Sequence, residues 1–407
     1  MLFGLASKCD QPLVVVEVGT SKIAVIVGEQ RNDGSIVISG FGRHDSSGVR
    51  KSEVMDYENA SRCLRLAISA AENMSDIDIR NVRLVFSGGR PQSVTNRSSL
   101  QIPNAAIGIN LDDIEEVAQL AKAVHIDEDR EVIHSINQHF YLDDKEPVDN
   151  PEGLFGQRLA LDMLILHVNL HRVHNTVQMI RDLGIDVVDV AFAGLYAALV
   201  VVTPEQKENG VLVIDLGGGT TDYVAYANNI VAAVGSLAVG GDHITNDIST
   251  AFRITTKQAE ALKRDAGSCQ VDTTMNRRRV DVASGDVLSK MTVNQGALNT
   301  VINARMVELF GIIKDQLESE RIMPHIGTGV VLTGGGAHLR GVDALARQVF
   351  GLPCAIGCPL GVTGQGEVTE VPDYAAPIGM VRNALRTGMR QGKASLFERI
   401  WRGIGMG

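Results

Sequence analysis

The sequence is poor in cysteine, has no excess of positive charge and contains no long hydrophobic run. Its five cysteines are odd in number and scattered, which argues against a disulfide framework and is typical of reduced thiols in a cytosolic protein. The formal net charge of −10 argues against a nucleic-acid-binding protein. The longest apolar stretch, Ala191–Val202, is too short to span a bilayer and predicts a core helix. A chain of 407 residues is instead long enough for more than one domain.

A glycine-rich turn at residues 217–221 gives the clearest indication of function. The runs Val211–Leu216 and Asp222–Ala227 are apolar and rich in strand-forming residues, which predicts the two strands of a hairpin. Successive backbone N–H groups in such a turn can surround phosphate oxygens, because glycine lets the chain bend closely around a ligand. The candidate phosphate-binding residues are Gly217, Gly218, Gly219, Thr220 and Thr221.

Asp215 stands at the end of the first of these strands. Magnesium on a nucleotide usually takes one or two protein carboxylates, so Asp215 is a candidate metal residue, directly or through water. The alternative is an ordinary hairpin whose glycines serve only the turn. Three glycines beside a carboxylate at the end of a strand favour phosphate binding.

Two other stretches carry related patterns. Leu13–Val18 is a β-branched run that includes an acid, Glu17, and is followed by Gly19-Thr20-Ser21-Lys22 and a second strand, which repeats the plan of the first hairpin. This weak repeat predicts two related halves around one site. Gly329–Thr333 reads as a buried strand that runs into three glycines and a helix, a pattern typical of a nucleotide crevice but weak alone. The three glycines are Gly334, Gly335 and Gly336.

The C-terminal segment 391–407 differs from the rest of the chain. At helical spacing its large apolar residues share one face, with charged residues opposite, which is typical of a helix that lies in a membrane interface. The alternative is a terminal helix docked on the protein's own core. The preceding glycines, Gly388 and Gly392, favour the membrane. The predicted lipid-facing residues are Leu396, Phe397, Ile400, Trp401 and Ile404.

Four motifs resemble those of the actin–Hsp70–hexokinase superfamily. Its two phosphate motifs resemble VVVEVGTSK (Val14–Lys22) and VIDLGGGTTD (Val213–Asp222), and its adenosine motif resembles VVLTGGGAHLRG (Val330–Gly341). AEALK (Ala259–Lys263) is similar to the segment whose Glu and Lys reach the nucleoside. Within the superfamily the tail and the stretch NPEGLFGQRL (Asn150–Leu159) resemble the FtsA family of bacterial cell-division proteins.

The resemblance implies an α/β protein with the actin-like ATPase fold. Two lobes of related βββαβα subdomains would flank a nucleotide cleft, with an FtsA-type 1C insertion. The implied parts are subdomain 1A at 1–86 and 161–193, completed by 372–390; subdomain 1C at 87–160; subdomain 2A at 194–252 and 326–371; subdomain 2B at 253–325; and a linker with the membrane helix at 391–407.

The resemblance also implies ATP and Mg²⁺ in the cleft. Glu17 and Asp215 would hold the metal through water, and Glu260 and Lys263 would contact the ribose. The implied cofactor-binding residues are Gly19, Thr20, Ser21, Lys22, Gly217, Gly218, Gly219, Thr220, Thr221, Gly241, Glu260, Lys263, Gly334, Gly335 and Gly336.

By resemblance, the protein polymerises on the cytoplasmic face of the membrane at the division septum. It would tether the tubulin-like ring protein FtsZ through 253–325 and recruit later division proteins through 1C, and no nucleic-acid partner is expected. Filament-forming and chaperone members of the superfamily carry a glutamate-proline that positions the attacking water, whereas this chain has Phe192-Ala193-Gly194. We therefore expect weak ATPase activity at most, and we assign no catalytic residue. The alternatives are a pilus-assembly PilM-like scaffold and a small-molecule kinase of the same superfamily.

Overall fold

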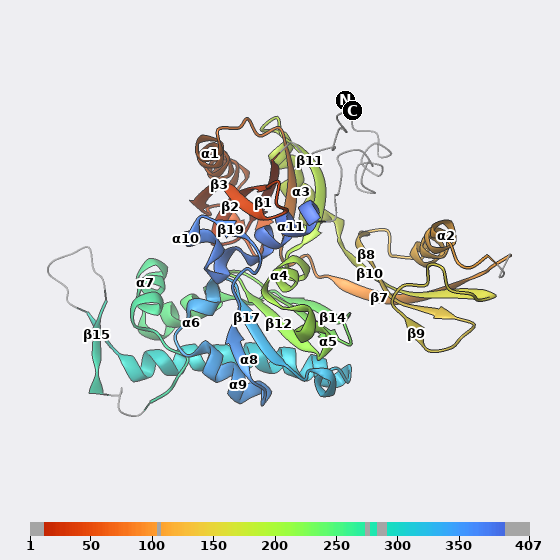
Figure 1. Cartoon of the computed structure of the whole chain (residues 1–407). Coiled ribbons are helices and arrows are strands. Elements are labelled where there is room, and N and C mark those ends of the chain that lie inside the picture. The colour runs from red at the N-terminus through yellow and green to blue at the C-terminus, as the bar shows by residue number, and fades with distance from the viewer. Residues whose placement is uncertain (1–11, 104–106, 273–276, 283–290, 387–407) are drawn as a thin grey trace. The chain divides into compact units, whose positions relative to one another are not determined.

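The computed structural model describes residues 12–103, 107–272, 277–282 and 291–386 and forms two compact units (Figure 1). One unit comprises residues 89–174, and the other comprises the parts of the chain before and after it. The five predicted lipid-facing residues of the tail lie outside the described residues. Among the residues that are described, no helix is long and apolar enough to cross a membrane.

The larger unit contains a six-stranded sheet in the order β11-β6-β1-β2-β3-β19. Strand β1 pairs antiparallel with β2 and parallel with β6, so it lies at the centre of the sheet. Five of its six residues are buried, as its apolar sequence predicts. The strands are β1 (Leu13–Val18), β2 (Lys22–Gln30), β3 (Ile36–Asp45), β6 (Asn81–Phe86), β11 (Asp186–Phe192) and β19 (Thr363–Gly364).

A second sheet of the same unit, in the order β14-β13-β12-β17-β18, repeats five strands of the first. Strand β12 pairs antiparallel with β13 and parallel with β17, as β1 does with β2 and β6. The weak repeat in the sequence therefore corresponds to a duplicated sheet. The strands are β12 (Val211–Leu216), β13 (Thr221–Ala227), β14 (Ile230–Leu237), β17 (Gly329–Thr333) and β18 (Cys354–Ile356).

Helices α4 and α11 pack against each other, and each also contacts one of the two sheets. Helix α11 lies on β1 and β2, and α4 lies on β12 and β13 (Figure 1). Their backbones cross closely, because a Cβ built at Gly379 would lie only 2.0 Å from the Tyr196 carbonyl oxygen. This crossing joins the two sheets into one body and brings the ends of β1 and β12 near each other.

The larger unit also contains helices and several short elements. The helices are α1 (Tyr57–Ser75), α3 (Leu170–Arg181), which begins in the smaller unit, α4 (Ala193–Val201), α5 (Pro204–Glu208), α6 (Gly241–Phe252), α7 (Thr256–Ala266), α8 (Gln295–Ser319), α9 (Val342–Phe350), α10 (Gly366–Thr369) and α11 (Ala375–Arg386). The short elements are β4 (Val49–Arg50), β5 (Glu53–Val54), β15 (Arg279–Asp281), β16 (Thr292–Asn294), η2 (Met323–His325), η3 (Gly335–His338) and η4 (Pro372–Tyr374).

The smaller unit is a four-stranded sheet, in the order β7-β10-β8-β9, with one helix packed against it. Leu159, Leu161, Met163 and Ile165 alternate along β10 and form its core together with residues of α2. The elements are β7 (Gln92–Gln101), α2 (Leu111–Lys122), β8 (Arg130–Leu142), β9 (Pro147–Val148) and β10 (Arg158–Asn169). The subdomain boundaries given above, including 87–160 for 1C, stay predictions.

Candidate nucleotide site

The turns after β1 and β12 are each closed by an equivalent backbone hydrogen bond. The Gly19 N–H donates to the Lys22 carbonyl oxygen at 3.0 Å, and the Gly217 N–H donates to the Thr220 carbonyl oxygen at 3.0 Å. In each turn four residues lie between the last paired residues of two antiparallel strands, which are Val18 and Ile23 in the first turn and Leu216 and Thr221 in the second. The two sheets therefore carry equivalent turns.

The tips of the two turns touch each other, which requires glycine in the second turn. A Cβ built at Gly219 would lie 2.3 Å from Thr20 Oγ1, and one built at Gly218 would lie 3.1 Å from Ser21 Cβ. Any larger residue at 219 would separate the turns. These glycines therefore allow the close approach of the two hairpins.

The third glycine run follows β17 and packs against the second hairpin. Gly334 has a φ of 80°, and a Cβ at this position would lie 2.1 Å from Asp215 Oδ1. Because both the left-handed backbone and the close contact exclude a side chain, glycine is required here. The strand and the glycine turn thereby bring the chain next to the carboxylate of Asp215.

A cavity of about 430 Å³ lies among these three turns. Every residue predicted to bind the cofactor or the metal lines it, from Glu17 in β1 to Gly336 after β17. Sequence reasoning did not select several other lining residues, which are Arg43, Ser52, Ser87, Asp222, Asp242, Ile244, Arg264, Met306, Leu309, His338, Leu339, Arg340 and Asp373.

Two acidic side chains, Glu17 and Asp215, can hold a cation where the two glycine turns meet in the cavity. Burial raises the pKa of Glu17 to about 7 and the pKa of Asp215 to about 6, while Lys22 lowers both. Glu17 Oε2 is buried and has no hydrogen-bond partner in the described part of the chain, as expected of an atom that awaits a ligand. A bound Mg²⁺ would stabilise both charged forms.

The geometry fits a metal held mainly by other ligands. Within the described residues, no group of three or more His, Cys, Asp or Glu side chains is arranged to hold a metal ion. Mg²⁺ commonly keeps several waters and binds one or two carboxylates together with substrate phosphates. Glu17 and Asp215 fit this pattern, with the phosphates and water completing the coordination.

Asp222 is a third buried carboxylate, and sequence reasoning missed it. Its Oδ1 accepts hydrogen bonds from Ser236 Oγ at 2.5 Å and from the Gly88 N–H at 3.3 Å, and burial raises its pKa to about 7. A signal was present: Asp222 lies directly opposite Asp215 in the hairpin, and opposed residues of an antiparallel pair point to the same face.

Residues 192–194 lie behind Asp222. Phe192 is fully buried, and a Cβ built at Gly194 would lie 3.0 Å from Asp222 Cβ. In the described chain, Asp222 lines the cavity but residues 192–194 do not. The carboxylate that lines this part of the cavity is therefore Asp222 on β13, and none comes from the start of α4.

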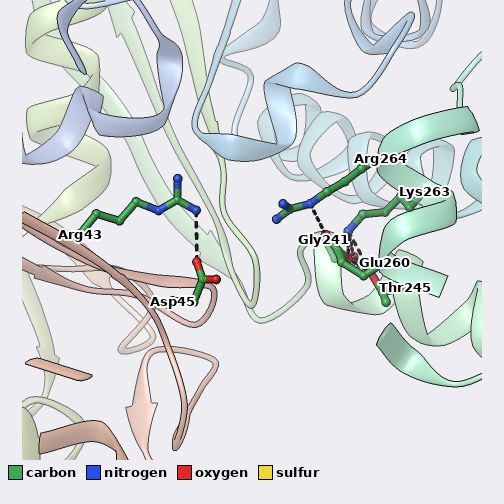
Figure 2. Close-up of polar contacts among 7 residues, drawn as sticks. All are labelled: Arg43, Asp45, Gly241, Thr245, Glu260, Lys263 and Arg264. Carbon is green, nitrogen blue, oxygen red and sulfur yellow. Dashed lines mark hydrogen bonds and ion pairs between the residues drawn. The ribbon is translucent and has the colours of Figure 1, made fainter. Parts of the chain in front are cut away.

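Glu260 and Lys263 also line the cavity and are joined to each other (Figure 2). Lys263 Nζ lies 2.6 Å from Glu260 Oε2 and donates to the Gly241 carbonyl oxygen at 3.0 Å. Arg264 Nε donates to the other Glu260 oxygen, Oε1, at 2.8 Å. Both carboxylate oxygens thus have partners, and a ribose hydroxyl would share or replace one of these contacts.

Apolar side chains also line the cavity. They are Ile244 of α6, Met306 and Leu309 of α8, and Leu339 after η3. An apolar wall beside the Glu260–Lys263 pair suits a flat base next to a ribose, because pockets for small molecules combine apolar walls with a few polar groups.

Comparisons with known proteins agree with this architecture. The family model described as "Cell division protein FtsA" matches residues 212–379, and the model "SHS2 domain inserted in FTSA" matches residues 88–167. The cell division protein FtsA of Escherichia coli is 31% identical over 404 residues, covering 97% of this chain and 96% of the relative. The FtsA proteins of Pseudomonas aeruginosa and Borreliella burgdorferi are 29% and 30% identical, over 92% and 91% of this chain and 89% and 90% of theirs.

Solved structures at lower identity share the fold. The PilM–PilN type IV pilus biogenesis complex matches with a TM-score of 0.62 at 17% identity, over 92% of this chain and 98% of that one. MreB5 of Spiroplasma citri bound to ADP matches with a TM-score of 0.57 at 16% identity, over 94% and 99%. The predicted actin-like ATPase fold with an FtsA-type insertion is confirmed. The chain belongs to the FtsA family of cell division proteins.

Proposed function

We propose that the chain is an ATP-binding division protein that polymerises on the membrane and tethers FtsZ to it at the septum. The observation that carries the proposal is the cavity in which two equivalent glycine turns and two buried carboxylates meet. Membership of the FtsA family supports the role in division. The solved structure of MreB5 bound to ADP, which shares the fold, supports a nucleotide in the cavity.

In this proposal the phosphates lie between the two turns. Backbone N–H groups of residues 19–21 and 217–221 would point at the β- and γ-phosphates, except those of Gly19 and Gly217, which donate to carbonyl oxygens within their own turns. Lys22 would add a positive charge. Glu17 and Asp215 hold Mg²⁺, which when bound neutralises charge on the phosphates. Glu260 and Lys263 would contact the ribose, and Gly334–Gly336 would lie beside the adenosine.

We expect slow hydrolysis because the segment at the start of α4 offers no carboxylate to position the attacking water. Asp222, which does line the cavity, already accepts hydrogen bonds from Ser236 Oγ and the Gly88 N–H. The start of α4 offers only Phe192, Ala193 and Gly194. Bound ATP would therefore set a conformation more than it supplies chemistry, and turnover at the rate of a metabolic kinase would contradict this.

Attachment to the membrane rests on the tail. A single short amphipathic helix binds lipid weakly, so several copies joined in a polymer would be needed for stable attachment. FtsZ would bind mainly through residues 253–325, and later division proteins would bind through the 1C region. The protein would then act on the cytoplasmic face of the membrane at the septum.

Two other functions have less support. A small-molecule kinase would need a substrate pocket beside the phosphates, and an amphipathic tail would be unexpected. A scaffold like PilM shares the fold, but its likeness of 17% identity says nothing of function, whereas the FtsA relatives match over almost the whole chain.

Cosedimentation with anionic vesicles and FtsZ tests the proposal. The full chain with ATP should carry FtsZ into the vesicle pellet, and deletion of residues 396–407 should leave both in the supernatant. The matched control is Trp401→Phe, which keeps an aromatic ring on the apolar face and should still pellet. Unchanged pelleting of the deletion variant would refute the membrane tether, and failure of FtsZ to follow the pelleted chain would refute the FtsZ tether.

A further inference from the structure

A short turn outside the three glycine motifs also reaches the phosphate end of the cavity. Lys51 and Ser52 connect β4 to β5, and Ser52 lines the cavity. The Ser52 N–H donates to Thr20 Oγ1 at 3.1 Å, which joins this turn to the first glycine turn. The second glycine turn also packs against Lys51, because a Cβ built at Gly219 would lie 2.9 Å from both Cα and N of Lys51.

The conformation of the turn is costly for its sequence. Lys51 and Ser52 have φ angles of 51° and 60°, and the paired residues Arg50 and Glu53 leave a two-residue loop between them. Such loops with two left-handed residues favour Asn-Gly, because a side chain disfavours positive φ. Residues in this conformation persist where the surrounding structure holds them in place.

The rest of the hairpin holds the turn in this position. The Gly48 carbonyl oxygen accepts hydrogen bonds from the Met55 N–H at 2.7 Å and from the Asp56 N–H at 3.0 Å. Asp56 then caps α1 by accepting a hydrogen bond from the Asn59 N–H. The turn is therefore fixed to the start of a helix and is not a loosely attached loop.

The positive charge of Lys51 also acts on a side chain near the start of α6. Burial and then the positive charge of Lys51 lower the pKa of His243. The backbone here is tied to the glycine turn, because the Gly241 and Asp242 N–H groups donate to the Gly217 and Gly218 carbonyl oxygens at 3.0 and 2.8 Å. The Lys51–Ser52 turn thus contacts both halves of the phosphate end.

We propose that this turn is a third phosphate-facing element and that Ser52 positions the terminal phosphate of a nucleoside triphosphate. Its hydroxyl would donate to a γ-phosphate oxygen, while its N–H stays on Thr20. A nucleoside diphosphate has no γ-phosphate, so it would not make this contact with Ser52. The inference rests on the proposed ATP site and adds the group that distinguishes triphosphate from diphosphate.

Calorimetric titration of the full chain with a non-hydrolysable ATP analogue and with ADP, both with Mg²⁺, tests the inference. Ser52→Ala removes the hydroxyl and keeps the N–H, so affinity for the ATP analogue should fall about tenfold while affinity for ADP changes less than about twofold. Ser52→Gly removes the same hydroxyl but relieves the positive φ, so it should lose the same selectivity and melt at a higher temperature than Ser52→Ala. If both variants lose the selectivity for the ATP analogue but melt at different temperatures, a change in stability cannot explain the loss.

Ser47→Ala is the matched control, because Ser47 is an exposed serine in the same segment. It should bind both nucleotides as the wild type does. If the Ser52 variants keep the wild-type ratio of the two affinities, or weaken both nucleotides equally, the role of Ser52 is overturned. If the wild type itself binds neither nucleotide, the proposed ATP site fails, which is a distinct result.

Discussion

Lys22 and Asp373 face each other across the phosphate end of the cavity, with Lys22 Nζ 3.7 Å from Asp373 Oδ1. Both side chains are mostly buried, at 12% and 21% exposure, and Lys22 Nζ also lies 4.9 Å from the centre of the Tyr374 ring. Asp373 and Tyr374 belong to η4, which leads directly into α11. A phosphate that drew Lys22 away would therefore change a contact at the start of the last described helix.

Asp373→Asn should strengthen the binding of ATP. The change removes a negative charge that competes with the phosphates for Lys22 and repels them. Because the pair is only partly shielded from water, we expect a gain of about three- to tenfold in affinity. Titration calorimetry measures it, with Asp78→Asn as the control, since Asp78 forms an exposed pair with Arg80. Weaker binding by Asp373→Asn would show that Asp373 supports the nucleotide.

Gly219→Ala should destabilise the protein and weaken nucleotide binding. A Cβ at this position would lie 2.3 Å from Thr20 Oγ1 and 2.9 Å from the Lys51 backbone, so the two glycine turns must separate. The expected cost is roughly 1–3 kcal/mol. Thermal melting checks this, and Gly311→Ala in α8 is the control with the opposite sign: nothing lies within 4 Å of its added Cβ, and a helix interior favours alanine by about 1 kcal/mol. Equal melting of both variants would contradict the close contact of the turns.

Asp215→Asn and Glu17→Gln should remove the effect of magnesium on nucleotide binding. The wild type should bind ATP at least about tenfold more tightly with Mg²⁺ than with a chelator, and each variant should lose most of this difference. Titrations in the two conditions measure it. Glu29→Gln, an exposed change at the end of β2, should behave as the wild type. If both site variants keep the full magnesium effect, these carboxylates do not hold the metal.

Glu131→Gln should make the protein more stable at pH 8 than the wild type is, but not at pH 4. Glu131 is 7% exposed, its Oε1 has no hydrogen-bond partner in the described chain, and burial raises its pKa from 4.5 to about 7. The folded state therefore binds the proton more tightly, so wild-type stability falls as the pH rises from 4.5 to 7. The difference between the proteins should grow by up to roughly 3 kcal/mol over this range.

Thermal melting at pH 4 and pH 8 measures the change. Glu128→Gln, an exposed change just before the same strand, should melt with the pH dependence of the wild type. The same pH dependence in the Glu131→Gln variant would show that Glu131 is ionised in the folded protein.

Local patterns carried enough information to predict the duplicated hairpins. Glu17 and Asp215 each stand just before a glycine turn, so strand, acid and turn are adjacent in the sequence and could be found together. The apolar run of β12 likewise predicted a buried strand.

Residues brought in by tertiary contacts could not be found in this way. Asp373 is distant from Lys22 in the sequence and reaches it only because η4 packs beside η3. Ser52 lies in a turn without glycine, and its role depends on contacts with Thr20 and Gly219 that no local pattern encodes. Asp222 differs from both, because its pairing with Asp215 could have been read from the hairpin register.

In the proposed function, occupancy of the cavity by ATP controls assembly on the membrane. Sedimentation of the full chain with anionic vesicles and FtsZ over a range of ATP concentrations measures this, beside the affinity from calorimetry. The FtsZ carried into the pellet should rise with ATP, with a midpoint at the dissociation constant, and Gly219→Ala should shift both together. Pelleting of FtsZ that is the same without nucleotide and unchanged in Gly219→Ala would contradict it.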